Sequence, residues 1–312
     1  MSSITFESFL CGTPATDYIF QDTPYEHQIE TAAEFIKKAD YVLIGAGAGM
    51  SAAAGALYGG EWFRKNFREF QEKYGNGQYK QDMYGAGFYP YTDERAYWGY
   101  WSKQAMFGGI ELDVTPLHKE VLSIVKNKKY FCISTNADGQ FKKAGMPDEN
   151  IFCTQGDYFH IQCAKACHNK IYDAVKMFKQ MNQARKDCLV PEYMVPKCPV
   201  CGGKMVMNLR CDGYFVEDEE WHNAERRFGK FLIEMLDSGK NICLLELGVG
   251  FNTPTIIRFP FEKMVRENRN ISLVRLNMNE AVIPESLTKR AVGINEDIKK
   301  SICAISELLY QR

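Results

Sequence analysis

The chain has 312 residues, of which 46% are hydrophobic and 25% are charged, a composition typical of a globular protein with a sizeable core. A formal net charge of −1 gives no basic excess, which argues against nucleic acid and anionic membranes as partners. No apolar run is long enough to cross a membrane, and the first residues lack the pattern of a secretory signal.

Strands and helices are predicted to alternate along most of the chain. In chain order they are a helix over 25–38, a strand over 41–44, a helix over 116–126, strands over 130–134 and 151–154, a helix over 217–236, a strand over 241–247, a helix over 254–267, a strand over 271–276 and a helix over 297–309. Apolar strands connected through helices are typical of a parallel sheet with helices on both faces. We therefore expect an α/β fold with a doubly wound parallel sheet.

Two segments interrupt this alternation, and we expect them to form a smaller second domain. Residues 58–107 contain three of the four tryptophans and helix-like runs over 61–74 and 92–107. This segment is either a helical part with an aromatic core or an aromatic wall that covers a ligand. Residues 158–212 contain a cysteine cluster and are expected to bind zinc. The large domain is then formed by residues 1–57, 108–157 and 213–312.

A glycine-rich turn directly follows the first predicted strand. Gly45, Gly47 and Gly49 occupy alternate positions, and Met50 and Ser51 begin a predicted helix. Glycine lets the backbone approach a ligand closely, and the amino end of a helix favours an anion. A strand, a glycine turn and a helix in this order predict a phosphate cradle, a signal of moderate specificity for a dinucleotide.

Polar side chains follow the next two predicted strands. Asn136 and Asp138 come after the strand over 130–134, and Gln155 follows the strand over 151–154. Ligands of open α/β sheets bind at the carboxyl ends of the strands, so these residues are candidates for a binding or catalytic site. The alternatives are that Asn136 and Asp138 cap a helix that begins near Gly139, and that Gln155 is an ordinary loop residue.

Four cysteines have the spacing of a metal site. Cys163 and Cys167 are four residues apart, and Cys198 and Cys201 belong to a Cys-Pro-x-Cys-Gly-Gly turn. Tetrahedral zinc takes four such ligands at about 2.3 Å, and a site without a position for water is structural. His168 is an alternative to Cys167 as the fourth ligand, and four free cysteines are the alternative to a metal. With eleven cysteines, an odd number, spread along the chain, a reducing cytoplasm fits better than a disulfide framework.

Arg210 lies between the cysteine turn and the return of the chain to the sheet. Its planar guanidinium suits an acceptor carboxylate or a phosphate. A surface salt bridge is the alternative.

The order of these motifs resembles the sirtuins, which are NAD-consuming protein deacylases and ADP-ribosyltransferases. The features kept are Gly47 to Ser51, Asn136-Ala137-Asp138, the cysteine cluster and Asn277. Two further features match in their order along the chain but are altered: Gln155-Gly156 stands for a His-Gly pair, and Gly248-Val249-Gly250 stands for a Gly-Thr-Ser turn. The resemblance implies a Rossmann-like fold with NAD in the cleft between the two domains. It implies that NAD is held by Gly47, Ala48, Gly49 and Ser51, by a second turn with Gly248, Gly250 and Asn252, and by Asn277 at the adenosine ribose. The alternative for the second turn is a plain strand end.

The resemblance also implies catalytic roles. Asn136 would position the ribose or a water, and Asp138 would accept a hydrogen bond from the nicotinamide amide. Two departures stand out: Gly55-Ala56-Leu57-Tyr58 replaces a Gly-Ile-Pro-Asp-Phe-Arg motif, and Gln155 replaces a histidine. Such departures are similar to the macrodomain-linked class M branch of the family. Members of that branch resemble mono-ADP-ribosyltransferases that modify a lipoylated, glycine-cleavage-H-like carrier, and in bacteria they are encoded beside a macrodomain hydrolase and a lipoate ligase.

The replacement of histidine by Gln155 changes the expected chemistry. In a deacylating sirtuin the histidine takes a proton from a ribose hydroxyl, which requires a base with a pKa near the working pH. A carboxamide can donate and accept hydrogen bonds but cannot hold that proton. Cleavage of the ribose–nicotinamide bond depends instead on positioning and charge stabilisation. We therefore predict an NAD-dependent protein mono-ADP-ribosyltransferase, with Asn136, Asp138, Gln155 and Arg210 as its catalytic residues.

Three other functions are weighed against this prediction. A lysine deacylase would need another base in place of the missing histidine. A non-enzymatic NAD-binding module would not need Asn136 and Asp138. A redox dehydrogenase would want an acidic residue at a strand end about 20 residues after the glycine turn, and the sequence has none there.

Overall fold

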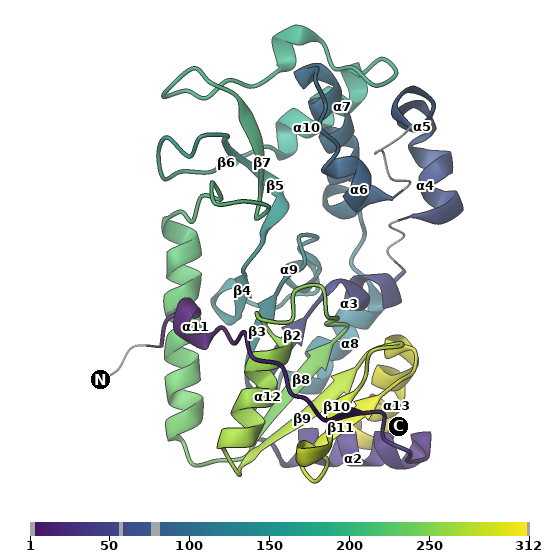
Figure 1. Ribbon diagram of the computed structural model, residues 1–312, viewed down its shortest axis with the longest axis vertical. Coiled ribbons are helices and arrows are strands. Elements are labelled where there is room, and N and C mark those ends of the chain that lie inside the picture. Colours follow the sequence, from purple (N-terminus) through teal and green to yellow (C-terminus); the bar gives the residue numbers. More distant parts are fainter. Residues whose placement is uncertain (1–3, 56–58, 76–81, 311–312) are drawn as a thin grey trace.

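The computed structural model describes residues 4–55, 59–75 and 82–310. Its centre is a six-stranded parallel sheet in the order β11-β9-β8-β2-β3-β4 (Figure 1). The strands are β2 (Tyr41–Ala46), β3 (Lys129–Ser134), β4 (Ile151–Cys153), β8 (Ile242–Leu247), β9 (Ile271–Leu276) and β11 (Ala291–Ile294). The order reverses between β2 and β8, and ligand sites of such sheets lie beyond the strand ends at this point.

Helices cover both faces of the sheet, because successive side chains of a strand point to opposite sides. Val42 and Ile44 of β2 pack into a cluster with the helices α2 (Tyr25–Lys38), α8 (Pro116–Val125) and α13 (Ile298–Tyr310). Tyr41 and Leu43 pack with α11 (Glu219–Asp237) and α12 (Arg258–Glu267) on the other face. The predicted doubly wound sheet is confirmed.

Most predicted elements are present, but the strands and the helix within residues 158–212 were not predicted. Elsewhere the main differences concern the last strand and two helices. The last strand, β11, was not predicted, since its four residues include a glycine and carry no turn signal before them. The helix predicted over 61–74 is two helices, α4 (Gly60–Asn66) and α5 (Arg68–Tyr74), which meet at Phe67. The helix predicted from 254 begins only at Arg258, after a series of turns.

The upper part of Figure 1 is formed by the two interrupting segments. It contains α6 (Met83–Gly87), α7 (Glu94–Ala105), a π-helical turn (Met106–Ile110), α10 (Val175–Ala184) and a small antiparallel sheet of β6 (Tyr172–Asp173), β5 (Gly156–Cys163) and β7 (Met205–Leu209). A single buried cluster combines Phe63 and Trp98 of the first segment with Phe178 and Met205 of the second. This shared core supports our proposal that residues 58–107 and 158–212 form one small domain. The proposed boundary at 57/58 falls outside the described residues.

Short elements complete the chain. They are α1 (Phe6–Phe9), β1 (Tyr18–Ile19), α3 (Ala48–Ala53), α9 (Gln140–Lys143) and β10 (Ile283–Pro284), with 3₁₀ turns at Asp148–Asn150, Glu192–Met194 and Glu285–Leu287. Within the described ranges, no helix has both the length and the apolar character that a membrane span requires.

Candidate active site

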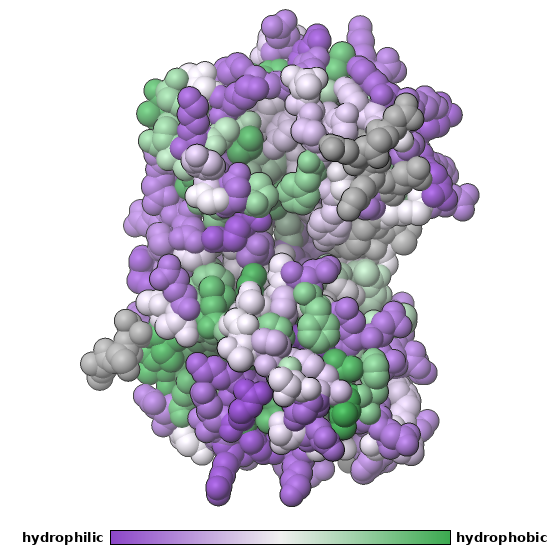
Figure 2. Space-filling model, in the orientation of Figure 1, coloured by the Kyte–Doolittle hydropathy of each residue, from purple (hydrophilic) through white to green (hydrophobic). Residues whose placement is uncertain are grey.

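A cavity of about 620 Å³ lies between the two parts of the molecule, and the space-filling view is hollowed there (Figure 2). Its lining comes from the ends of β2, β3, β4 and β8 on one side and from α6, α7, β5 and β7 on the other. The predicted site residues that line it are Gly47, Ala48, Gly49, Asn136, Asp138, Gln155, Arg210, Gly248, Gly250, Asn252 and Asn277. Ser51 is not among the lining residues.

The two glycine turns form the floor of the cavity by packing against each other. The Gly49 N–H donates to the Gly248 carbonyl at 3.0 Å. A Cβ on Gly47 would lie 2.7 Å from that same oxygen, and a Cβ on Gly248 would lie 2.1 Å from the Met50 nitrogen. Gly248 also has a φ of +63°, which glycine adopts without strain. These glycines are therefore required by the contact between the turns, in addition to any contact with a ligand.

Asp138 is buried at the base of the cavity with its carboxylate held on both sides. The Ser51 hydroxyl donates to Oδ2 at 2.5 Å, and the Gln140 N–H donates to Oδ1 at 3.0 Å. Asn136 Nδ2 donates to the Gly47 carbonyl at 2.9 Å and to Ser51 Oγ at 3.1 Å. The N-cap of α9 is Gly139, which makes no side-chain cap hydrogen bond; Asp138 precedes it, accepts the N–H of the first residue of α9, and also lines the cavity. Ser51 lies behind the lining, where it orients Asp138.

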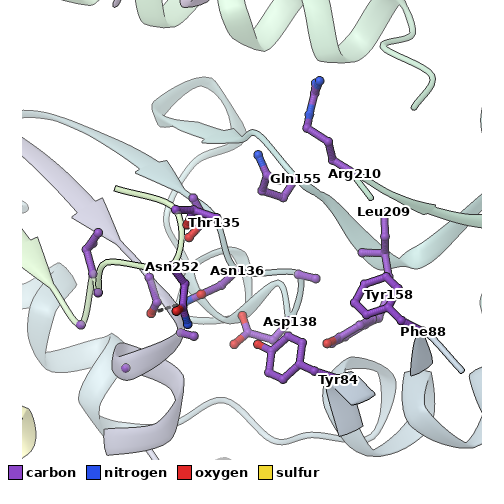
Figure 3. A pocket seen from close by; sticks show the side chains of 18 of the residues that line it. Tyr84, Phe88, Thr135, Asn136, Asp138, Gln155, Tyr158, Leu209, Arg210 and Asn252 are labelled. Atoms are coloured by element: carbon purple, nitrogen blue, oxygen red, sulfur yellow. Dashed lines mark hydrogen bonds between the residues drawn. The ribbon is translucent and has the colours of Figure 1, made fainter. Parts of the chain in front are cut away.

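Gln155 and Arg210 lie side by side at another part of the cavity (Figure 3). The Arg210 N–H donates to the Gln155 carbonyl at 3.0 Å, and Gln155 Nε2 donates to Thr154 Oγ1 at 3.3 Å. The Arg210 guanidinium donates to Glu217 Oε1 at 2.5 Å and stacks over the Phe215 ring at 4.2 Å. Arg210 therefore makes the partly exposed salt bridge of one alternative while it also lines the cavity.

The end of the cavity near β9 is fixed by side chains that hold backbone groups. Asn277 Nδ2 donates to the Val249 carbonyl at 3.0 Å. Glu280, which sequence analysis missed, lines the cavity and accepts the Phe251 N–H at 3.2 Å. A carboxylate three residues after Asn277 was the only signal for it. A Cβ on Gly250 would lie 2.5 Å from Glu280 Oε2, so a larger residue there would displace the end of the Glu280 side chain.

Aromatic side chains of the small domain form the opposite wall of the cavity. Tyr84, Phe88 and Trp101 come from α6, its C-terminal end and α7, and Tyr158 comes from β5. Burial raises the pKa of the Tyr84 and Tyr158 hydroxyls, so both stay protonated at neutral pH. The segment 58–107 therefore provides both an aromatic core and a cavity wall, the two possibilities that the sequence left open.

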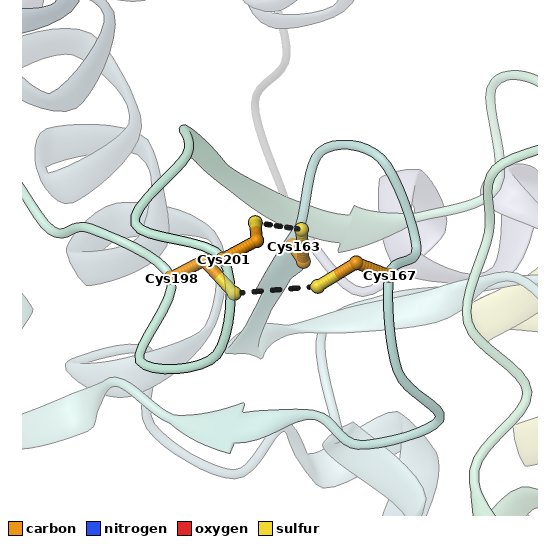
Figure 4. Close-up of side chains that lie close together, drawn as sticks. All are labelled: Cys163, Cys167, Cys198 and Cys201. Atoms are coloured by element: carbon orange, nitrogen blue, oxygen red, sulfur yellow. Dashed lines mark hydrogen bonds between the residues drawn. The ribbon is translucent and has the colours of Figure 1, made fainter.

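The four predicted cysteine ligands are brought together away from the cavity (Figure 4). Their sulfur atoms all lie within 4.8 Å of one another, with 3.7 Å between Cys163 and Cys201 and 3.6 Å between Cys167 and Cys198. A tetrahedron of thiolates about 2.3 Å from zinc has edges of about 3.8 Å, so the donor set and its spacing fit structural zinc. His168 Nδ1 lies 3.1 Å from Cys167 Sγ, and its Nε2 lies 2.8 Å from the Tyr172 hydroxyl. The group of mutually close ligand atoms consists of the four thiols, which favours Cys167 over His168 in the proposed site.

A buried histidine next to the site predicts a pH-dependent stability. The His118 side chain is buried, its Nδ1 lies 2.6 Å from Thr115 Oγ1, and its Nε2 has no partner among the described residues. Burial lowers its pKa from 6.5 to about 4, although the nearby Asp138 charge opposes this shift. Because the unfolded chain takes up the proton first, His118 stabilises the fold fully above pH 6.5, and this contribution is lost as the pH falls to 4.

We therefore expect the His118→Asn variant to lose less stability on acidification than the original chain. The difference between the two slopes should approach about 1.4 kcal/mol per pH unit between pH 6.5 and 4. Urea unfolding of both proteins at pH 7.5, 6 and 5 measures it. Parallel pH dependences would show that His118 does not carry the effect.

Comparison with known proteins gives two similar sequences and a common fold, although no protein-family model matches the chain. It is 35% identical over 276 residues to a Staphylococcus aureus protein named protein ADP-ribosyltransferase, with 88% of this chain and 86% of the relative covered. It is 30% identical over 299 residues to a Fusarium oxysporum protein named "probable bifunctional ADP-ribose hydrolase/ADP-ribosyltransferase", covering 91% of this chain but 48% of that protein, so the chain spans about half of it. The solved structure of a Sir2 homologue in complex with NAD has 14% identity and a TM-score of 0.57, with 95% and 97% of the two chains covered, which shows a common fold.

Proposed function

Because this chain belongs to the sirtuin-type protein ADP-ribosyltransferases, we propose that it transfers ADP-ribose from NAD to a lipoylated carrier protein and releases nicotinamide. The observation that carries transfer over deacylation is the lining of the cavity. It contains Gln155 next to Arg210 and, among the described residues, no histidine. Without an imidazole in reach of the ribose, the proton transfer that deacylation needs has no base there.

The proposed reaction is a displacement at the ribose carbon that bears nicotinamide. The bond between this carbon and the nicotinamide nitrogen breaks, and a carboxylate oxygen of the acceptor forms the new bond. Nicotinamide leaves with the bonding electron pair and becomes neutral, so no proton has to be moved. Asp138 and Asn136 would orient the nicotinamide end of NAD at the base of the cavity. The glycine turns, Asn252 and Asn277 would bind the remaining part of NAD.

Arg210 is proposed to bind the acceptor carboxylate. Arg210 lines the cavity, and its guanidinium already pairs with the carboxylate of Glu217, which is not among the lining residues. Both side chains are about one-third exposed, so a carboxylate from another protein can compete for the same donors. Arg210, the neighbour of Gln155, would thus bind the acceptor carboxylate, and no side chain there would act as a general base.

The lipoylated nature of the acceptor is supported by the aromatic wall. Tyr84, Phe88, Trp101, Tyr158 and Leu209 offer apolar surface beside Asp138, which suits an aliphatic arm such as lipoyl-lysine. We also propose a functional pairing with a macrodomain hydrolase and a lipoate ligase. The name of the Fusarium oxysporum relative, which joins a hydrolase and a transferase, supports the hydrolase.

Intact-mass spectrometry tests this function directly. The purified protein and NAD are mixed with a lipoylated carrier domain, with its unlipoylated form or with an acetyl-lysine peptide, and released nicotinamide is quantified. One ADP-ribose added to the lipoylated carrier alone is the expected result. O-acetyl-ADP-ribose from the peptide would establish the deacylase instead, and NAD binding without nicotinamide release would leave a non-enzymatic module.

The Gln155→His variant tests the argument from the missing base. If the cavity otherwise suits sirtuin chemistry, an imidazole at this position should produce O-acetyl-ADP-ribose from the acetyl-lysine peptide where the original chain produces none. A general base contributes about 10²–10⁴-fold, so the gain should be measurable by mass spectrometry. Gln155→Asn, which introduces no base, is the matched control. Equal deacylation by the original chain and the variant would refute the role given to Gln155.

A further inference from the structure

Four charged side chains are buried together beneath the β9 side of the cavity. They are Glu246 of β8, Arg258 and Glu262 of α12, and Arg275 of β9, and each is at most 1% exposed. Glu246 and Arg275 are partners in the β8–β9 register. Arg275 donates to Glu246 at 2.7 and 2.9 Å and to Glu262 at 2.9 Å. Buried charges are costly to desolvate unless they are paired and hydrogen-bonded.

Both arginines also donate to backbone carbonyls in the loops above them. Arg258 Nη1 donates to the Val249 carbonyl at 2.8 Å, and Nη2 donates to the Glu280 carbonyl at 2.6 Å. Arg275 Nη1 donates to the Val282 carbonyl at 2.6 Å. Val249 and Glu280 line the cavity, and they belong to the two loops that follow β8 and β9. One guanidinium therefore ties together both loops at this end of the cavity.

Arg258 and Arg275 differ in the groups that their guanidinium groups contact. Arg275 is paired with both carboxylates at hydrogen-bonding distance, whereas the nearest atoms of Arg258 lie 3.8 and 3.9 Å from them, and its Nε has no hydrogen-bond partner among the described atoms. The short contacts of Arg258 are those to the loop carbonyls. The Phe251 ring, whose N–H is held by Glu280, lies 4.0 Å above its guanidinium.

We infer that Arg258 is a positioning residue for NAD: it fixes the carbonyls of Val249 and Glu280 and so keeps the Gly248–Thr253 turn and Glu280 in the shape that binds the nucleotide. The inference rests on the proposed NAD site and adds to it a residue that touches neither NAD nor the acceptor. A preorganised loop binds more tightly because its ordering does not have to occur during binding. Loss of Arg258 therefore weakens NAD binding and leaves the chemistry at Asn136 and Asp138 intact.

The test compares Arg258→Met and Arg258→Lys with Arg290→Met. Arg290 is a matched control, since it also donates to two carbonyls, those of Asn268 and Ile271, but at the opposite end of β9 and outside the cavity lining. NAD affinity is measured by calorimetry without an acceptor, and KM and kcat are measured from nicotinamide release. We expect Arg258→Met to raise the Kd and KM for NAD about tenfold or more with kcat changed less than about threefold.

Arg258→Lys should recover part of the affinity, because an ammonium can donate to at least one of the two carbonyls. It also keeps the comparison informative if Arg258→Met does not fold. Arg290→Met should lower the melting temperature without a change in Kd. Unchanged NAD affinity in both Arg258 variants, or an equal loss of NAD affinity in Arg290→Met, would overturn the role of Arg258 but not the proposed NAD site. Failure of the original chain to bind NAD would overturn the proposed site together with it.

Discussion

The Asp138→Asn variant is expected to release nicotinamide about 10²–10³-fold more slowly than the original chain. Asp138 and Glu280 are the only acidic side chains among the described residues that line the cavity, and Asp138 is the one that is buried, at 5% exposure. In the proposed site its negative charge would lie near the nicotinamide end of NAD, where positive charge develops on the ribose as nicotinamide leaves. Asparagine keeps the size of the side chain but removes the charge, so the loss should appear in kcat.

Two measurements separate this effect from a change in folding. Circular dichroism should show that Asp138→Asn keeps its helices, because asparagine can still accept the Gln140 N–H. Asp157→Asn is a suitable control, since Asp157 also accepts backbone N–H groups, those of Phe159 and His160, but does not line the cavity. A control that lost as much activity as Asp138→Asn, or an Asp138→Asn variant with full activity, would refute the proposed role.

The second large effect is expected from removal of the metal. The protein should contain one zinc per chain, and Cys198→Ser should lose the metal and melt at a temperature lower by more than about 5 °C. Cys163 and Cys198 are buried in the same core cluster as Phe178 and Met205, so loss of the site loosens the small domain that forms one wall of the cavity. Metal analysis and thermal unfolding, with and without a chelator, measure both effects.

Cys211→Ser provides the control for this experiment. Cys211 is exposed, lies one residue from Arg210 and does not belong to the cluster of four thiols. Its replacement should leave the zinc content and the melting temperature unchanged. A zinc-free original chain, or a Cys198→Ser variant that melts with the original chain, would contradict a structural metal at this place.

Local patterns account for the elements of the large domain. The strand predicted over 271–276 has the bounds of β9, and the helix predicted over 25–38 has the bounds of α2, because both carry apolar residues at the right period. The glycine turns, Asn136, Asp138 and Gln155 were found for a related reason. A residue placed directly after a buried parallel strand must lie at the sheet edge where ligands bind. The cysteine spacing likewise predicted the zinc site, because the two cysteines of each pair belong to one short segment.

The residues that sequence analysis missed depend on distant parts of the chain. Arg258 sits on a helix and Glu246 and Arg275 sit inside apolar strands, and nothing local shows that their charges meet beneath two loops. Their pairing exists only because β8 and β9 are neighbours in the sheet and α12 covers them. Ser51 itself was predicted as an NAD-binding residue, but its contact with Asp138, which spans 87 positions, was not predicted.

The amino-acid order was enough to establish the α/β class, the site edge of the sheet, the four thiols and the absence of a histidine base at position 155. These are properties of short segments, for which spacing along the chain and spacing in the fold are nearly the same. Only the tertiary structure showed that the aromatic segment forms both a core and a cavity wall. It also showed that the two glycine turns pack against each other, and that a buried arginine donates hydrogen bonds to both loops near β9. These depend on contacts between residues far apart in the chain, which form when packing excludes water and each buried polar group must find a partner.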